Sequence, residues 1–249
     1  MVDSLKEDVH FYIDNAPPEE VAFALRVLSA DLPLTGKQVS QALTSQYGFT
    51  MQKDVTYSPR RLYDLGLAKQ VKNSAKQLAY VLTDSGLMVQ QLMASQPELA
   101  FDLLHYLHYS GYTTGASGRK YLWSYRVCCD LLWSTRKNLS NTTIASRVQS
   151  VMKERFPDLD FTAPEGVRFD GTGAGRAKTW IRVLTPSPLG SDADELVPRQ
   201  TKAWQLPVLA LDLVYRERQY PYKSPMLLDD GLSEELARVF FLEPSSCLH

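Results

Sequence analysis

Apolar residues recur every three or four positions through much of the chain, which is the spacing of one face of an α-helix. The first such run begins after Pro17, where a proline and two glutamates are typical of a first helical turn, and it ends before Pro33. The second run begins at Thr35, whose hydroxyl can cap free N–H groups, and closes at Gly48. The pattern therefore predicts two helices in the first 48 residues.

A third helix is predicted over residues 58–65, and it starts with a serine followed by a proline. Pro59 fits the first helical position, where the helix does not need its missing N–H group. The helix carries Arg60, Arg61 and Tyr63, which are expected to face outward while its leucines face inward. The sequence thus predicts a short helix with a polar and partly basic outer surface.

A β-hairpin and a fourth helix are predicted next. Gly66, directly after the third helix, is a common way to end a helix. Residues 67–72 and 78–82 alternate between apolar and polar positions as strands do, and residues 73–76 between them have the composition of a turn. Residues 83–86 then have the composition of a helix start.

The order helix, helix, helix, hairpin, helix is that of the winged-helix fold. The stretches RLYDLGLAKQV and YVLTDSG resemble the hairpin region of winged-helix proteins such as the MarR and PadR groups. The resemblance covers residues 18–95, under a third of the chain. It implies that the third helix enters the major groove of DNA and that the hairpin contacts the backbone or the minor groove. We therefore expect a winged-helix domain over residues 1–96 and a second domain over residues 97–249.

The second domain is predicted to be mainly helical. Helices are expected over residues 97–109, 121–133, 142–156 and 233–242. Residues 158–184 indicate two strands joined by a glycine-rich turn, so this region is expected to contain α+β elements. A second winged-helix-like module over residues 140–185 is an alternative arrangement of the same segments. The expected fold class is mainly α with α+β elements, with an N-terminal winged helix-turn-helix.

Charge is distributed unevenly along a chain whose formal net charge is only -1. Residues 52–78 hold six basic and two acidic residues, and residues 119–155 hold eight basic and two acidic residues. The last fifty residues hold five basic and seven acidic residues. Local positive potential attracts phosphate even on a nearly neutral protein. The distribution favours one face directed toward a polyanion.

The candidate DNA-binding residues lie in and around the third helix and on the hairpin. Arginine side chains read guanine edges or contact phosphate, and lysines on a hairpin contact phosphate. From the third helix and the segment before it, the candidates are Lys53, Thr56, Arg60, Arg61 and Tyr63. From the hairpin, they are Lys69, Lys72, Asn73 and Lys76. The alternative is that these residues are ordinary solvated charges on a winged helix that binds protein.

A glycine-rich run over residues 171–179, GTGAGRAKT, is similar in composition to a phosphate-binding loop. Such a loop needs a glycine directly before the lysine, and Ala177 stands there instead. The following residues alternate as a strand does. We therefore expect a hairpin turn, with Arg176 and Lys178 at a basic tip that adds contacts to nucleic acid.

Metal and catalytic sites are not predicted. His105 and His108 share a helix face, and Cys128 and Cys129 are adjacent, but zinc needs four ligands with a recognisable spacing. Neighbouring cysteines in an apolar helix are more often small core residues. The sequence contains no Gly-x-Ser-x-Gly motif of the kind used by hydrolases. No cofactor and no enzymatic activity are therefore expected.

The cysteine content and the absence of a long apolar run indicate a cytoplasmic protein. Three cysteines, two of them adjacent, do not suit a secreted disulfide framework. No uncharged apolar run approaches the about 18 residues that span a bilayer. The expected function is binding of double-stranded DNA by a transcriptional regulator, or by an accessory subunit similar to those of prokaryotic DNA-modification and phage-defence systems. A homodimer or a protein-complex partner is expected, and the alternative is a scaffold subunit whose winged helix assembles proteins.

Overall fold

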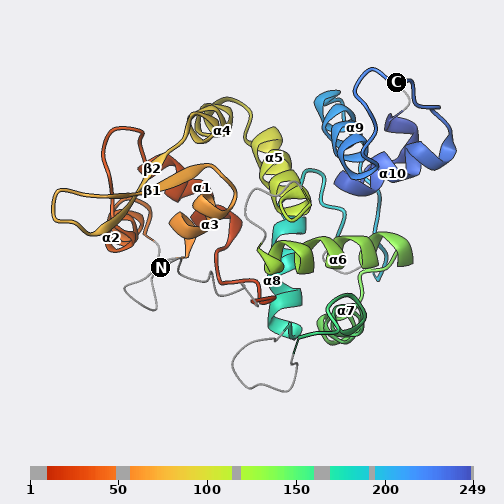
Figure 1. The fold of residues 1–249 in the computed structure, drawn as a ribbon, viewed down its shortest axis with the longest axis horizontal. Helices are drawn as coiled ribbons and strands as arrows, with labels where there is room; N and C mark the ends of the chain where they lie inside the picture. The colour runs from red at the N-terminus through yellow and green to blue at the C-terminus, as the bar shows by residue number, and fades with distance from the viewer. Residues whose placement is uncertain (1–9, 49–56, 114–118, 160–168, 191–193, 248–249) are drawn as a thin grey trace.

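A computed structural model of the chain describes residues 10–48, 57–113, 119–159, 169–190 and 194–247. In these residues it has ten α-helices and one two-stranded antiparallel sheet (Figure 1). The protein is therefore mainly helical, as the sequence predicted. The hairpin projects at one end of the long axis, and the last two helices lie at the other end (Figure 1).

The first six elements form the end of the molecule that carries the hairpin. They are α1 (Pro18–Val27), α2 (Gly36–Tyr47), α3 (Ser58–Asp64), β1 (Ala68–Lys72), β2 (Leu78–Leu82) and α4 (Asp84–Ser95). Helix α1 packs on both α2 and α3, and α4 packs against α1 and β2. The order of elements is the one that the sequence predicted.

Local capping signals set the ends of these helices. The Thr35 side chain accepts a hydrogen bond from the Gln38 N–H, and the Gln38 side chain accepts one from the Thr35 N–H, so α2 starts with a capping box. Gly48 ends α2 and Gly66 follows α3, both with positive φ (69° and 74°). Thr83 caps α4 through the Gly86 N–H.

The hairpin is closed by residues 73–77. Strand β1 pairs with β2 so that Lys69 lies opposite Val81 and Lys72 lies opposite Leu78. The Asn73 side chain accepts a hydrogen bond from the Gln77 N–H (2.9 Å), and Lys76 adopts a left-handed conformation with φ 59°. Asn73 is thus a turn-forming residue, since its amide oxygen is occupied by the turn itself.

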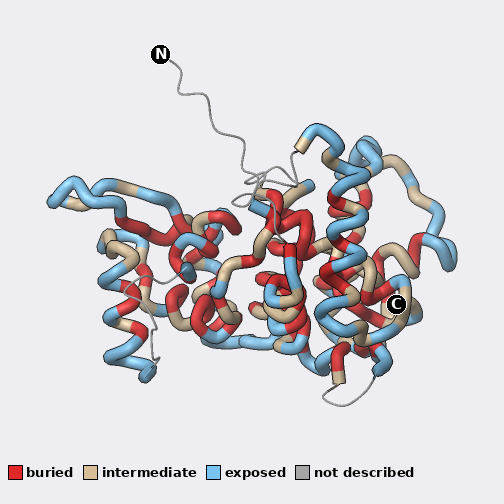
Figure 2. Tube along the Cα trace, turned by 90° about the horizontal axis from the view of Figure 1, so that it is seen from below, coloured by how far each residue is buried: buried red, intermediate tan, exposed pale blue. Residues whose placement is uncertain are grey.

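The remaining elements form the larger part of the molecule. They are α5 (Pro97–Ser110), α6 (Lys120–Thr135), α7 (Asn141–Arg155), α8 (Gly171–Arg182), α9 (Gln205–Glu217), α10 (Asp230–Phe240) and the short 3-10 helix η1 (Pro244–Cys247). Helix α6 packs against α5, α7, α8 and α10. The buried positions follow these contacts and are concentrated where the helices meet (Figure 2).

The prediction of two strands and a turn over residues 158–184 is wrong where the structure describes this segment. Residues 171–182 form helix α8, which Asp170 caps by accepting a hydrogen bond from the Gly173 N–H (2.9 Å). Ala174, Ala177 and Ile181 are fully buried, and their spacing is helical. Three glycines in the first helical turns concealed that spacing, because glycine marks turns more often than helices. The described residues after α4 contain only isolated bridges and no named strand.

The residues before α1 connect the two ends of the molecule. The Phe11 ring packs edge-on against Trp123 of α6 and against Phe156 after α7, with centroid distances of 5.6 and 5.1 Å. The Trp180 indole N–H of α8 donates to the Ala16 carbonyl (3.1 Å). The first segment therefore packs on the C-terminal helices before the chain enters α1.

Candidate nucleic-acid interface

The hairpin carries an exposed set of lysines with no acidic residue among them. Lys69, Lys72 and Lys76 are exposed, and the sequence between Leu65 and Thr83 contains no aspartate or glutamate. None of the three lysines forms an ion pair with another described residue. Their ammonium groups therefore face solvent and are not paired with a carboxylate of another described residue. The inner side of the hairpin is buried through residues such as Ala68, Tyr80 and Leu82.

Helix α3 presents a smaller outer surface than the sequence suggested. Arg60 is exposed, Tyr63 is half-buried, and Tyr57 directly before the helix is exposed. Arg61 was expected to face outward, and this prediction is wrong because the side chain is only 2% exposed. A seven-residue helix leaves its flanks close to other elements, and here one flank lies against α6.

Arg61 packs on an aromatic ring of the C-terminal part. Its guanidinium carbon lies 4.1 Å from the centroid of the Tyr121 ring of α6. A second contact joins its Nη2 to the Asp14 carbonyl at 3.5 Å, while Nη1 is buried without a hydrogen-bond partner among the described residues. A cation stacked on a ring away from water is stabilised by up to about 2 kcal/mol. Arg61 is thus a packing residue between α3 and α6.

Asp64 adds a polar contact at the same place. The Tyr121 hydroxyl donates to the Asp64 carboxylate at 3.1 Å, and the Arg119 guanidinium pairs with it at 3.2 Å. Burial raises the pKa of Asp64, and the nearby arginines partly offset that rise. We call the set Arg61, Asp64, Arg119 and Tyr121 the α3–α6 contact. It holds the third helix at a fixed position on the larger part of the molecule.

The start of α3 is held on its other side by α1. The Ser58 hydroxyl donates to the Glu20 carboxylate, and both residues are buried. Helix α3 therefore lies between α1 and α6, and its exposed surface is limited to the side that carries Arg60. Lys53 and Thr56, which the sequence also suggested, lie outside the described residues.

Arg176 and Lys178 do not lie at a hairpin tip. Both belong to α8: the Arg176 guanidinium donates to the Ile13 carbonyl at 2.8 Å, and the ammonium of Lys178 donates to the Leu139 carbonyl. Lys178 is buried, and burial lowers its pKa. The predicted basic tip is therefore wrong, because the glycine-rich run forms a packed helix. These two cations join α8 to neighbouring segments.

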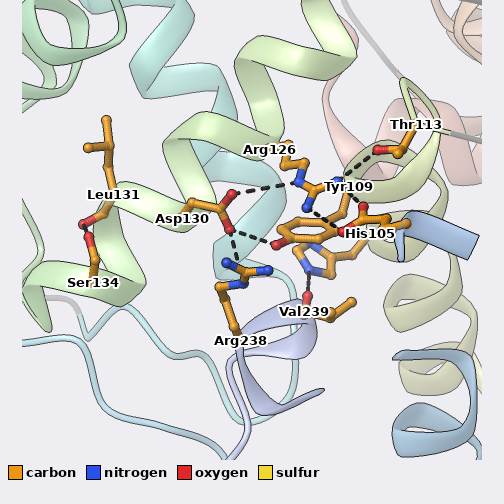
Figure 3. A network of polar contacts seen from close by, with 10 residues as sticks. His105, Tyr109, Thr113, Arg126, Asp130, Leu131, Ser134, Arg238 and Val239 are labelled. Carbon is orange, nitrogen blue, oxygen red and sulfur yellow. Dashed lines mark hydrogen bonds and ion pairs between the residues drawn. The ribbon is translucent and has the colours of Figure 1, made fainter. Parts of the chain in front are cut away.

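The second basic zone is partly exposed. Arg147, Lys153 and Arg155 of α7 reach solvent, as the sequence predicted for this helix. Arg126 is instead engaged, and Figure 3 shows it beside Tyr109, Asp130 and Arg238. The Tyr109 hydroxyl donates to Asp130 at 2.6 Å, and Asp130 also pairs with both arginines. This polar network joins α5, α6 and α10 and leaves little charge free for a ligand.

His105, His108, Cys128 and Cys129 are core residues. His105 is hydrogen-bonded to the Tyr125 hydroxyl and the Val239 carbonyl, each at 2.7 Å, and burial lowers its pKa to about 3. Cys128 and Cys129 are fully buried, and burial raises both thiol pKa values. Within the described residues, no three His, Cys, Asp or Glu side chains gather closely enough to hold a metal ion.

Sequence reasoning missed the residues that connect α3 to the rest of the molecule. Phe11 and Ile13 are buried in the segment before α1, and their alternation with polar neighbours was a signal for that packing. The role of Tyr121 as a partner of Arg61 had no local signal, because sixty residues separate the two positions.

Comparisons with protein-family models, with curated proteins and with solved structures found no match to this sequence. No helix in the described residues combines the length and the hydrophobicity that crossing a bilayer requires.

Proposed function

We propose that residues 1–96 form a winged-helix domain that binds double-stranded DNA. In this proposal Arg60 and Tyr63 of α3 face the major groove, and the hairpin contacts phosphates as a wing. The arrangement of three helices, a hairpin and a fourth helix supports the proposal. The observation that carries it is the exposed, acid-free hairpin with three lysines that have no ion pair among the described residues.

The phosphate contacts expected of the hairpin suit its geometry. Lys69 and Lys72 lie on strand β1 and Lys76 lies in the turn that follows it. The hairpin that carries them lies at the end of the molecule (Figure 1), where a long polyanion is not excluded by other elements. Each phosphate contact releases counterions and makes binding weaker as salt rises. The proposed role is non-enzymatic, either in transcriptional regulation or as a DNA-targeting accessory subunit. Residues 97–249 then serve for dimerisation or for a protein partner.

A scaffold role is less well supported by the surface of α3. A winged helix that assembles proteins needs an apolar surface on this helix, and its exposed side carries Arg60 instead. Among the described residues of α3 and its immediate neighbours in the sequence, Tyr57 is the one large hydrophobic residue that is exposed, at 41%. DNA remains the better partner for this side of the molecule.

The test is DNA binding by the full chain across a salt series. Replacing Lys69, Lys72 and Lys76 by Gln should make the negative slope of log affinity against log salt less steep by about 2.7, because each phosphate contact contributes about 0.9 to its magnitude. The matched control replaces three exposed lysines elsewhere, Lys137, Lys202 and Lys223, by Gln. Absence of binding at low salt, or an equal effect of the control, would contradict the proposal.

A further inference from the structure

A cleft opens where α4 passes into α5, at a distance along the chain from the hairpin. Its volume is about 630 Å³, which is within the range of small-molecule sites. One wall is formed by residues 95–99 and Asp102, and the other by residues 201–205. A second hollow of about 530 Å³ shares residues 201–204 with the first. Trp204 lines both hollows.

Trp204 is the feature that distinguishes this cleft. Trp204 is 71% exposed, whereas the other three tryptophans of the chain are buried and each is at most 8% exposed. A large indole in water is unfavourable unless it has a further use, and its flat face offers a stacking surface for a planar ring. The two hollows leave room beside it. A planar, aromatic ligand therefore fits the wall of the cleft.

One of the side chains that line the cleft belongs to a buried ion pair. Asp102 lines the cleft, and Arg199 pairs with its carboxylate at 2.6 Å while being 1% exposed. Thr185 lines the same space, and its carbonyl lies 3.5 Å from Arg199 Nη1. The Nε of Arg199 has no hydrogen-bond partner among the described residues. Asp102 and Thr185 therefore place polar groups in the lining of the cleft, of the kind that orients a ligand.

The charges at the rim suit a ligand that carries both amino groups and phosphate. Glu98 is a carboxylate that accepts hydrogen bonds from amino groups, and Lys202 is an exposed cation. Helices α5 and α9 begin at the cleft, and neither Gln96 nor Trp204 caps its helix with a side chain. The N-terminal end of a helix carries partial positive charge and favours an anion such as phosphate, in addition to the lysine.

We propose that this cleft binds a purine nucleotide, with the base stacked on Trp204. Glu98 accepts hydrogen bonds from an amino group of the base, and Lys202 with the start of α9 contacts the phosphate. Figure 1 shows α9 beside α5, and residues at the start of each helix line the cleft. The proposal does not depend on DNA binding, because no hairpin or α3 residue takes part.

The probe is adenosine 5′-monophosphate, titrated into the full chain while tryptophan fluorescence is followed. Because Trp204 is the exposed tryptophan, saturable quenching is expected in the wild type and should be absent in Trp204→Ala. Trp204→Phe should retain binding by calorimetry, since a ring remains for stacking. Quenching that rises linearly without saturation would overturn the proposal, and so would unchanged binding by Trp204→Ala.

Two further variants test the assigned contacts. Lys202→Gln should weaken the binding of adenosine monophosphate about tenfold, which corresponds to about 1.4 kcal/mol of binding free energy. It should leave the binding of adenosine unchanged. Glu98→Gln should weaken both ligands, and Lys223→Gln, a change of another exposed lysine, should weaken neither. Glucose serves as a ligand that stacks on indole without a base. Saturable binding of glucose in preference to the nucleotide would overturn the assignment of the ligand class.

Discussion

Arg61 and Arg60 are neighbours in the sequence with opposite environments. Arg60 reaches solvent, whereas Arg61 is buried on Tyr121 and next to the Asp14 carbonyl. Because the two side chains are identical and lie in one short helix, substituting Arg60 tests the effect of an arginine charge on binding, and substituting Arg61 tests its effect on packing. The two positions are therefore matched controls for each other.

Arg61→Ala is expected to lower the free energy of unfolding by about 2–4 kcal/mol. The change removes a stacked cation and one of the positive charges near the buried Asp64 carboxylate. Arg60→Ala should change stability by less than about 0.5 kcal/mol, because it is a surface position. Urea denaturation of both variants measures the difference. Equal stability of the two would contradict the buried role of Arg61.

The buried histidines predict a loss of stability in mild acid. Burial lowers the pKa of His105 to about 3 and the pKa of His108 well below its usual value. Both residues are therefore neutral in the folded state near neutral pH. Their burial costs no free energy of unfolding above about pH 6.5, which is the pKa of histidine in the unfolded chain, because both states then hold neutral histidine. As pH falls below 6.5, the unfolded state takes up protons that the folded state does not. Each histidine then lowers the free energy of unfolding by about 1.4 kcal/mol per pH unit.

The effect of one histidine can be isolated by substitution. His105→Gln should reduce the dependence of unfolding free energy on pH by about 1.4 kcal/mol per unit between about pH 6 and 4. The raised pKa values of Asp64 and Asp102 act in the opposite direction, and they are present in both proteins. Identical pH profiles for wild type and His105→Gln would refute the assignment.

At the scale of elements, Gly86 joins the hairpin to α4. A Cβ atom at this position would lie 2.0 Å from the Leu67 carbonyl oxygen, which is backbone and does not move aside cheaply. Thr83 donates to the Gly66 carbonyl at 2.8 Å in the same region. The start of α4 and the beginning of the hairpin are therefore in direct contact.

Gly86→Ala is expected to destabilise the protein by more than about 2 kcal/mol, within the range of overpacked positions. Gly36→Ala is the control, because a Cβ there meets nothing within 4 Å and the residue lies in the first turn of α2. That variant should be neutral or slightly stabilising. Thermal unfolding of the two variants compares them, and a neutral Gly86→Ala would show that the backbone adjusts.

Helices with local signals were predictable from the sequence, and those without were not. Thr35, Ser140 and Thr83 mark helix starts that the structure has at the expected places. Helix α8 was missed because three glycines suggested a turn, although Phe169 and Trp180 bury against its neighbours. The orientation of Arg61 was missed because it depends on Tyr121, which lies in a different helix. Exposed lysines on the hairpin needed no tertiary contact and were predicted.

At the scale of the whole molecule, Arg199 fixes the C-terminal segments on α5. Its side chain pairs with Asp102, its N–H donates to the Phe241 carbonyl at 2.7 Å, and its carbonyl accepts from the Glu243 N–H at 2.8 Å. A buried arginine therefore joins α5, the residues before α9 and the end of α10. The C-terminal part depends on this pair for its arrangement.

Arg199→Ala is expected to lower the free energy of unfolding by about 3–5 kcal/mol, because it leaves a buried carboxylate without its partner. Arg216→Ala is the control, since its pair with Asp212 is exposed and worth less than about 1 kcal/mol. Chemical denaturation followed by circular dichroism compares the two. A loss below 1 kcal/mol for Arg199→Ala would mean that Asp102 is solvated by water in its absence.

The α3–α6 contact has a consequence for communication through the molecule. Because α3 is held on α6 by Arg61 and Asp64, the helix proposed to read DNA does not change its angle independently of the C-terminal helices. A molecule that binds the C-terminal helices and displaces α6 would change DNA affinity by some factor. DNA would then change the affinity for that molecule by the same factor, since such coupling is reciprocal.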